Sequence, residues 1–207
     1  MARRPLTSPR KHASQARSRA TVDALVEATA RILIREGFDR ASTNRIAEVA
    51  GVSIGSLYQY FLGKEALVAA VIDRHNQNVM QVVRAALTEV AAQPIKQAVR
   101  RMVATAIEAH RIDPKLHRVL SEQIPRTGRL KNVEIFGRET YALVQAYLEA
   151  HRHELRAVDL ELAAFVCATS IEALTHAAVV HRSDPLSDHA AATLVDEATR
   201  LLVRYLR

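Results

Sequence analysis

The amino-acid sequence predicts an all-α protein. Ala, Leu, Val and Arg dominate the 207 residues, whereas Gly and Pro number only six each, and this composition favours helices over strands. Apolar residues recur at helical spacing, and no segment shows the strict alternation of a half-buried strand. Apolar residues make up 49% of the chain, which is enough for a sizeable core.

The first two helices are predicted from periodicity and from the residues at their ends. Apolar spacing over residues 22–33 predicts a first helix. We expect it to end at Gly37, because glycine suits the left-handed position after a helix. Either Ser42 or Thr43 can cap a second helix, and Gly51 should end it.

A third helix, which is short, should begin after Ser53 and end near Tyr60. A fourth should begin at Gly63–Lys64 and continue to about Ala92. Beyond it, Asp-Pro, Pro-Arg-Thr-Gly and Ser-Asp-Pro sequences punctuate the chain. The remaining helices are expected at residues 95–111, 115–123, 131–154, 157–181 and 188–206.

Positive charge is concentrated at the N-terminus. Residues 1–19 contain six basic side chains and no acidic one, while the rest of the chain holds 23 basic and 22 acidic residues. We expect this arm to be flexible, because it lacks apolar periodicity. A basic arm before a nearly neutral body is typical of a nucleic-acid contact. A solubilising tail is the alternative.

The second and third predicted helices form a helix-turn-helix. Gly51 permits the positive φ that a tight turn between helices needs, and Val52 can fill the angle between them. In such a motif the second of the two helices reads the major groove of DNA. Leu57 and Phe61, four residues apart, can both point inward.

The other side chains of the third helix are then left at or near the outside. Among them are Tyr58, Gln59 and Tyr60. A tyrosine hydroxyl can bond phosphate, its ring can touch a thymine methyl, and glutamine can pair with a base edge. The alternative is that Tyr58 or Tyr60 packs against the first or the fourth helix.

The run from Thr43 to Leu67, TNRIAEVAGVSIGSLYQYFLGKEAL, resembles the N-terminal signature of TetR-type (TetR/AcrR) transcriptional regulators. It matches every fixed position of that signature, and the resemblance covers about residues 18–67. One departure is Leu62, where proline is common in the family. The resemblance implies a dimeric, repressor-like regulator whose two helix-turn-helix units read successive major grooves of a pseudo-palindrome.

The family pattern also implies which residues contact DNA and how the chain is divided. The expected DNA-binding residues are Thr43, Arg45, Ser53, Ile54, Gly55, Ser56, Tyr58, Gln59, Tyr60 and Lys64. Arg45 could equally be a solvated surface charge. The expected parts are the arm at residues 1–19, a helix-turn-helix domain at 20–66, and a helical effector-binding and dimerisation domain at 67–207.

The last two predicted helices suggest a homodimer. The segment at 160–180 is apolar nearly all round, which indicates burial on more than one side, and the family resemblance implies a four-helix interface between subunits. The alternative is a monomer with one central helix. The expected interface residues are Phe165, Ala168, Ile171, Leu194, Val195, Ala198, Leu201, Leu202 and Tyr205.

The middle helices should enclose any effector pocket, and their aliphatic background suggests an apolar effector. Polar residues that could face such a pocket are Arg101, His110, His117, Gln123, Asn132, Tyr141 and Gln145. Each could instead be a surface or core residue. We expect no metal site, because His151 and His153 point to opposite sides of a helix, and no cofactor. Cys167 should be an inert core residue.

Together these observations predict a regulator that binds operator DNA as a homodimer and is released by a small molecule. The segment at 160–180 contains Glu161, Glu172 and His176, which predicts that it falls short of a spanning helix, so we expect a cytoplasmic protein. One alternative is a DNA-binding protein without an effector, controlled by a protein partner. An enzyme is the other alternative, but the sequence shows no paired acid–base site.

Overall fold

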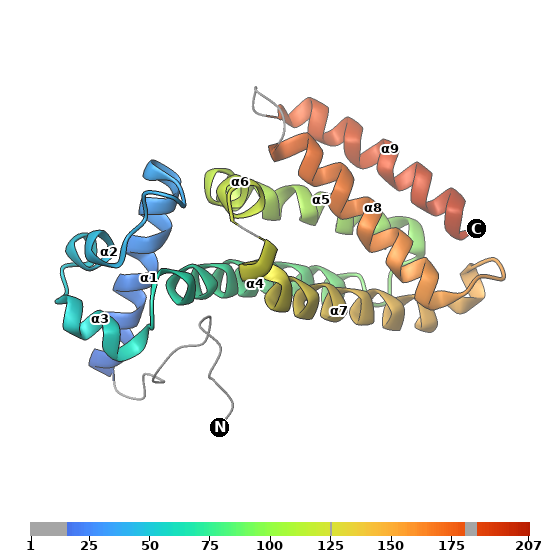
Figure 1. The fold of residues 1–207 in the computed structure, drawn as a ribbon. Helices are drawn as coiled ribbons and strands as arrows, with labels where there is room; N and C mark the ends of the chain where they lie inside the picture. The colour runs from blue at the N-terminus through green and yellow to red at the C-terminus, as the bar shows by residue number, and fades with distance from the viewer. Residues whose placement is uncertain (1–15, 125, 181–185) are drawn as a thin grey trace. The chain divides into compact units, whose positions relative to one another are not determined.

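The computed structural model describes the backbone of residues 16–124, 126–180 and 186–207, and the side chains of 18–124, 137–180 and 186–207. Within these ranges the chain consists of α-helices and one 3-10 turn, with no strand (Figure 1), which confirms the predicted fold class. The helices are α1 (Ala16–Glu36), α2 (Thr43–Ala50), α3 (Ile54–Tyr60), α4 (Lys64–Glu89), α5 (Ile95–Ile112), α6 (Pro114–Glu122), α7 (Arg126–Ala150), α8 (Leu160–Val180) and α9 (Asp188–Leu206).

The ends of the first three helices are set by the residues that the sequence singles out. Gly37 and Gly51 have positive φ angles of 81° and 67°, a conformation that costs a residue with a side chain about 1–2 kcal/mol. Ser42 accepts a hydrogen bond from the Arg45 backbone N–H, and Ser53 accepts one from that of Ser56. Each serine satisfies a donor that the first turn leaves open.

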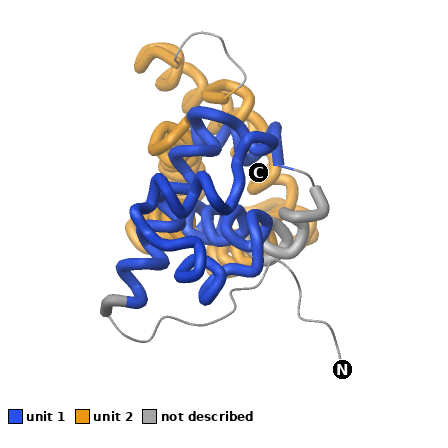
Figure 2. The backbone as a smooth tube through the Cα atoms, turned by 60° about the vertical axis from the view of Figure 1, so that its left-hand side comes forward, with its two compact units in different colours: residues 1–76, 115–133 blue, residues 77–114, 134–207 orange. Residues whose placement is uncertain are grey.

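The chain divides into two compact units (Figure 2). Unit 1 comprises Met1–Asn76 and Lys115–Val133, and unit 2 comprises Gln77–Pro114 and Glu134–Arg207. Helix α4 therefore contributes its first half to unit 1 and its second half to unit 2. The basic arm over residues 1–15 lies outside the described residues, and α1 begins at Ala16, within the segment expected to be flexible.

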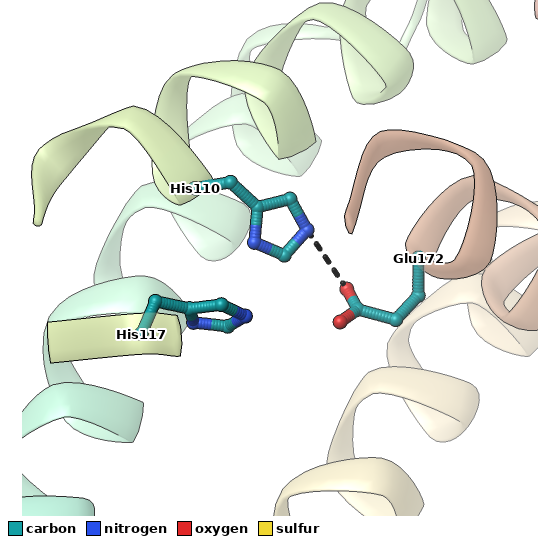
Figure 3. A group of neighbouring side chains, drawn as sticks. All are labelled: His110, His117 and Glu172. Atoms are coloured by element: carbon teal, nitrogen blue, oxygen red, sulfur yellow. Dashed lines mark ion pairs between the residues drawn. The ribbon is translucent and has the colours of Figure 1, made fainter. Parts of the chain in front are cut away.

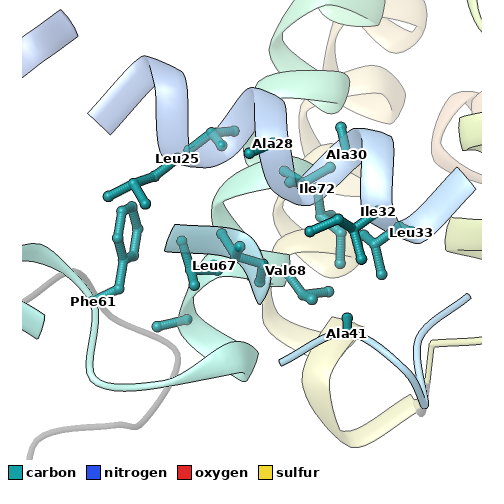
Figure 4. Packing of buried hydrophobic residues seen from close by; sticks show 14 of the residues in the cluster. Leu25, Ala28, Ala30, Ile32, Leu33, Ala41, Phe61, Leu67, Val68 and Ile72 are labelled. Carbon is teal, nitrogen blue, oxygen red and sulfur yellow. The ribbon is translucent and has the colours of Figure 1, made fainter. Parts of the chain in front are cut away.

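Unit 1 has a continuous apolar core (Figure 4). Leu25 and Leu33 of α1, Phe61 after α3, and Leu67 at the start of α4 are fully buried in it. These side chains come from three segments, and Ile46 of α2 and Leu57 of α3 are buried in the same cluster, so the short α2 and α3 are held by packing rather than by their own length. This packing supplies the stability that an isolated helix of seven or eight residues lacks.

Helix α6 joins the core of unit 1, a placement that the sequence analysis did not anticipate. Its buried residues Leu116, Val119 and Leu120, followed by Ile124, pack in the same cluster as α1 to α4. The expected boundary put everything after residue 66 into one effector domain. In the structure, the compact unit that contains the helix-turn-helix continues to Asn76 and also includes α6.

In unit 2, α5 packs against α8 and α9. Its buried side chains, among them Ile95 and Val103, meet Ala163 of α8 and Leu202 of α9 in a second apolar cluster. Small residues on α8 let its neighbours approach closely. The core of unit 2 is therefore built mainly from α5, α8 and α9, with Leu148 of α7 added to it. Helices α8 and α9 are the two that were expected to form a dimer interface.

Helix α8 is long and apolar enough, by length and composition, to cross a membrane, and 33% of its most apolar stretch is buried inside the protein. The expectation that this segment falls short of a spanning helix is thus not supported by its hydropathy. Leu162 and Phe165 are exposed on it, whereas Ala163, Ala164 and Cys167 are buried. One side of α8 belongs to the core of unit 2, and the other carries uncovered apolar surface.

Candidate nucleic-acid interface

Helix α3 lies on the core of unit 1 through one face. Leu57 and Phe61 are fully buried, as their four-residue spacing predicted. Ser53 starts the helix by accepting the Ser56 N–H at 3.1 Å, and its hydroxyl also lies 2.8 Å from the Ser56 hydroxyl. Capping and packing together determine which side chains of α3 face solvent.

The solvent face of α3 carries apolar, aromatic and amide groups. Ile54, Gly55, Tyr58 and Gln59 are exposed, and 42% of Tyr58 is accessible. Neither Ile54 nor Tyr58 contributes to the core, so both side chains are available to a ligand. Hydroxyl, amide and methyl groups are the ones that read base edges and hold phosphates.

A hydrogen bond links this face to α2. The Thr43 Oγ1 and Tyr58 hydroxyl atoms are 3.1 Å apart. Thr43 stands at the first position of α2, where backbone N–H groups are still open to an anion. The structure therefore brings together two of the residues that the family pattern assigns to DNA contacts.

Tyr60 is placed differently from the expectation. It was expected at or near the outside of α3, but it is only 8% exposed and belongs to the apolar cluster of unit 1 with residues of α1 and α4, as the alternative for this residue had it. The reason is helical spacing: position 60 follows the buried Leu57 by three residues and precedes the buried Phe61 by one, so its ring turns to the core side. Tyr58 and Tyr60 thus have opposite surroundings.

Lys64 already has partners within unit 1. Its Nζ atom donates a hydrogen bond to the Phe38 carbonyl at 3.1 Å and lies 4.2 Å from the centre of the Phe38 ring. A cation over an aromatic face contributes about 0.5–1 kcal/mol at a partly exposed site. Lys64 therefore connects the start of α4 to the loop after α1, whether or not it also contacts phosphate.

Arg45 projects from α2 and forms ion pairs with Glu48 at 2.9 Å and with Glu36 at 3.5 Å. The hydrogen bond that Arg45 donates to Glu48, together with the charges of both carboxylates, raises the pKa of Arg45 above its ordinary value. Arg45 and Glu48 are well exposed to solvent, and Glu36 is partly buried. The pairs compete with any phosphate contact, in keeping with the alternative that Arg45 is a solvated surface charge.

Two family models match this chain over most of its length. The model described as "Bacterial regulatory proteins, tetR family" matches residues 25–71, and the one described as "Tetracyclin repressor-like, C-terminal domain" matches residues 94–206. The second match alone covers more than half of the chain. The protein belongs to the TetR family of DNA-binding transcriptional regulators. Family members are regulators rather than enzymes, and they bind DNA as dimers.

Curated relatives align with the N-terminal part of this TetR-family chain. The nucleoid occlusion factor SlmA of Haemophilus ducreyi is 33% identical over 86 residues, which is 42% of this chain and 42% of SlmA. The HTH-type transcriptional activator FasR of Mycolicibacterium smegmatis is 40% identical over 63 residues, which is 30% of this chain and 29% of FasR. The chain thus matches well under half the length of these relatives.

Solved structures share the fold over nearly the whole chain. The fatty acid degradation regulator FadR of Bacillus halodurans has a TM-score of 0.69 at 18% identity, covering 95% of this chain and 98% of FadR. A TetR/AcrR-family regulator of Thermobifida fusca has a TM-score of 0.64 at 18% identity, covering 90% and 98%. At such identities the likeness shows the fold alone.

The residues expected to face an effector are divided between the units. His117 and Gln123 belong to unit 1, and Arg101, His110, Tyr141 and Gln145 belong to unit 2. Asn132 lies outside the residues whose side chains are described.

The two residues of unit 1 make contacts inside that unit. His117 Nδ1 lies 3.0 Å from His75 Nε2, and Gln123 accepts a hydrogen bond from the Phe38 N–H at 3.4 Å. The Gln123 side chain also approaches Gly37 so closely that a Cβ atom there would lie 2.9 Å from its Oε1. Both residues therefore help to seat α6 in unit 1.

In unit 2 the four remaining residues have separate surroundings. Arg101 pairs with Glu89 and Glu108, and the Glu89 hydrogen bond raises its pKa. The Tyr141 hydroxyl is 3.4 Å from the Thr169 hydroxyl, and its ring meets that of Phe165 edge-on at 5.7 Å. Gln145 is exposed and His110 is buried.

A groove of about 670 Å³ runs along α5 and α9 in unit 2. It contains none of the residues expected to bind an effector. Its lining residues are Lys96, Arg100, Asp196, Thr199, Arg200, Val203, Arg204 and Arg207.

The expected dimer residues fall into two groups. Val195, Ala198 and Leu202 are buried in the core of their own subunit, so they are not available to a partner. Phe165 and Leu201 are exposed, while Ala168, Ile171, Leu194 and Tyr205 are partly buried. These three residues were expected at the interface because they form an apolar stripe on α9. In the structure that stripe packs into the core of its own subunit.

Leu162 was missed by the sequence analysis. It is 55% exposed on α8. Counting helical positions from Ala163 and Cys167 could have found it, because Leu162 points away from both. That signal was hidden by the uniformly apolar composition of the segment.

Proposed function

We propose that this TetR-family regulator is a repressor that binds a pseudo-palindromic operator as a homodimer. The observation that carries the proposal is the exposed face of α3, where Ile54, Tyr58 and Gln59 face solvent and the Thr43 hydroxyl meets that of Tyr58. Two such faces, one per subunit, would enter successive major grooves about 34–36 Å apart, or a multiple of that. Acting on the operator places the protein in the cytoplasm.

Each exposed group has an assigned role in the proposed complex. Gln59 pairs with a base edge, adenine being its best partner, and Ile54 offers a contact to a thymine methyl group. Tyr58 and Thr43 hold phosphates, as do Ser53 and Ser56 at the start of α3. Gly55 allows the helix backbone to approach the duplex. Arg45, Tyr60 and Lys64 act through the fold of unit 1, because each is already engaged there.

The proposed dimer interface lies on the uncovered apolar surface of α8 and α9. Leu162 on α8 and Leu201 on α9 are each more than half exposed. Exposed leucines beside a core that is already complete are typical of an interface between subunits. A second copy of the chain would cover them, whereas the buried side of both helices stays within the subunit.

Release of the operator by a small molecule rests on linkage. Suppose that an effector binds better to a conformation in which the two helix-turn-helix units of the dimer are not spaced to fit successive major grooves. Such an effector must weaken operator binding, and the operator must weaken effector binding by the same factor. Helix α4 is shared by the two units. In the proposed mechanism it transmits the conformational change from the effector-binding unit to the DNA-binding unit. The likeness of residues 94–206 to the C-terminal domain of a tetracyclin repressor supports a ligand-responsive body.

Selection of bound duplexes from a random DNA pool tests the proposal. Enrichment of an inverted repeat is expected for the wild-type protein. Gln59→Ala should lose preference at one position of each half-site, while Gln97→Ala, an exposed glutamine on α5, should select the same repeat as the wild type. Failure to enrich any sequence, before and after refolding of the protein from denaturant, would overturn it.

A DNA-binding protein controlled by a protein partner is the second candidate function. Two observations favour it. An 86-residue stretch of this chain is similar to SlmA, which is named a nucleoid occlusion factor. In addition, the residues expected to bind an effector are divided between the two units. Once the operator is known, a small-molecule screen for its release separates the two functions. Release by a low-molecular-weight fraction of cell extract supports an effector, and release only by its protein fraction supports a partner.

A further inference from the structure

Three side chains of metal-ligating type lie on α5 and α8 within unit 2, where His110 is next to both of the others. His110 comes from the last turn of α5, and Glu172 and His176 come from α8. Glu172 and His176 are four residues apart, so they share one face of their helix. The proposed DNA-binding function uses none of the three.

The separation of His110 from Glu172 is that of two ligands around one ion. His110 Nε2 lies 3.4 Å from Glu172 Oε2, and in Figure 3 the imidazole and the carboxylate face each other along this line. Two ligand atoms bound to one tetrahedral zinc at 2.0–2.2 Å are about 3.4 Å apart. The contact is long for a strong hydrogen bond between these groups and suits a shared cation.

The second imidazole has a matching position. The rings of His110 and His176 meet edge-on with their centroids 5.6 Å apart. Two imidazoles bound to one tetrahedral zinc place their centroids about 5 Å apart. In the proposed site, rotation of the side chains brings nitrogen atoms of both rings, together with the carboxylate, around a single ion.

Burial and charge strengthen the case. His110 is only 5% exposed, and a cation bound beside it would be compensated by the charge of the Glu172 carboxylate. Glu172 supplies one negative charge, and the histidines supply neutral nitrogen ligands. Two nitrogens and one carboxylate oxygen are a donor set that suits zinc and neighbouring first-row metals, leaving a fourth position for water or another ligand.

We infer that His110, Glu172 and His176 form a binding site for a divalent transition-metal ion, with zinc as its best occupant. The ion ties the end of α5 to α8. This differs from the sequence-based expectation of no metal site, which considered only histidines close together in the chain. The inference does not depend on the proposed operator or effector.

Thermal unfolding of the chelator-treated full chain, with and without zinc(II), provides the test. Zinc at about 100 times its dissociation constant should raise the Tm by about 5–10 °C. Cobalt(II) should give the visible absorption of a four-coordinate site. Glu172→Gln and His176→Gln should each weaken binding at least about tenfold, and His189→Gln, an exposed histidine on α9, should leave it unchanged.

Glu172 and His176 are preferred for substitution because both are more accessible than His110, so their variants should fold. The Tm of each variant without metal checks this. The inference is overturned if zinc and cobalt do not bind the wild-type chain. It is also overturned if both folded variants bind zinc as tightly as the wild type does.

Discussion

Tyr58 and Tyr60 show how two identical residues acquire different roles within one turn of helix. Tyr58 is 42% exposed and shares a hydrogen bond with Thr43, whereas Tyr60 is 8% exposed and lies in the core of unit 1. Their separation by two residues places them about 200° apart around α3. The distinction predicts different consequences for the same substitution.

We expect Tyr58→Ala and Tyr60→Ala to separate binding from folding. Tyr60→Ala should lower the free energy of unfolding by about 3 kcal/mol, because it removes a large buried ring. Tyr58→Ala should change it by no more than about 0.5 kcal/mol and weaken operator binding about tenfold, the loss of one good contact. Urea unfolding and a DNA-binding titration measure the two effects.

Tyr58→Phe serves as the matched control, since it keeps the ring and removes only the hydroxyl. An intermediate loss of DNA affinity would divide the contact between ring and hydroxyl. Equal destabilisation by Tyr58→Ala and Tyr60→Ala would contradict the assignment of opposite faces.

Cys167 is expected to be chemically inert in the folded protein. Burial in α8 raises the pKa of its thiol to about 11, so the reactive thiolate is scarce at neutral pH. A disulfide reagent such as DTNB should label the native chain far more slowly than the chain in denaturant, and the rate should rise with pH up to the unfolding transition. Rapid stoichiometric labelling of the native chain at pH 7 would refute this.

At the scale of single elements, α3 is held in place by several local interactions, each of which is weak by itself. A helix of seven residues is unstable on its own. Ser53 caps it, the positive φ of Gly51 ends the preceding helix, and Leu57 with Phe61 anchors it to the core. These contributions come from within a few residues along the chain, which is why the helix-turn-helix could be predicted so closely.

Helix α6 behaves in the opposite way, because its position depends on contacts with distant segments. Leu120, 6% exposed, packs with residues of α1 and α4 in the core of unit 1. We expect Leu120→Ala to lower the free energy of unfolding by about 2–4 kcal/mol and to speed amide hydrogen exchange in α1, α2 and α3. Mass spectrometry of exchanged peptides locates the effect.

Ile112→Ala provides the comparison, because Ile112 is an exposed aliphatic residue at the end of α5. It should change the free energy of unfolding by no more than about 0.5 kcal/mol. If Leu120→Ala instead accelerated exchange only in α5, α8 and α9, then α6 would belong with unit 2.

At the scale of the whole molecule, the uncovered apolar surface of α8 and α9 determines the expected state in solution. Leu162→Glu and Leu201→Glu place charges on the proposed interface, and a buried unpaired charge is costly. Each variant should dissociate the dimer, with a dissociation constant raised at least about 100-fold, and should weaken operator binding accordingly. Sedimentation equilibrium measures the association directly.

Ile112→Glu is the control for added charge, because Ile112 is an equally exposed apolar residue of unit 2 that is not on α8 or α9. It should sediment as the wild type does. A wild-type chain that remains monomeric at micromolar concentration would remove the basis of the dimer proposal.

Much of this protein could be predicted from short stretches of sequence. The all-α class, the ends of α1 to α3 and the inward positions of Leu57 and Phe61 follow from capping residues, left-handed glycines and helical spacing. Each of these depends on backbone conformation and on neighbours within about four residues. Such interactions are encoded locally, and the TetR signature between Thr43 and Leu67 likewise consists of residues close together in the chain.

Other features required the packing of segments far apart in the chain. The burial of Tyr60, the place of α6 in unit 1 and the inward side of α9 were each mistaken or missed. A helix that is apolar nearly all round, such as α8, does not reveal which side faces its own core. His110 and Glu172 are 62 positions apart in the chain and likewise come together only when α5 and α8 pack. The direction of a side chain on a helix predicts its contacts only when the position of the neighbouring helix is known.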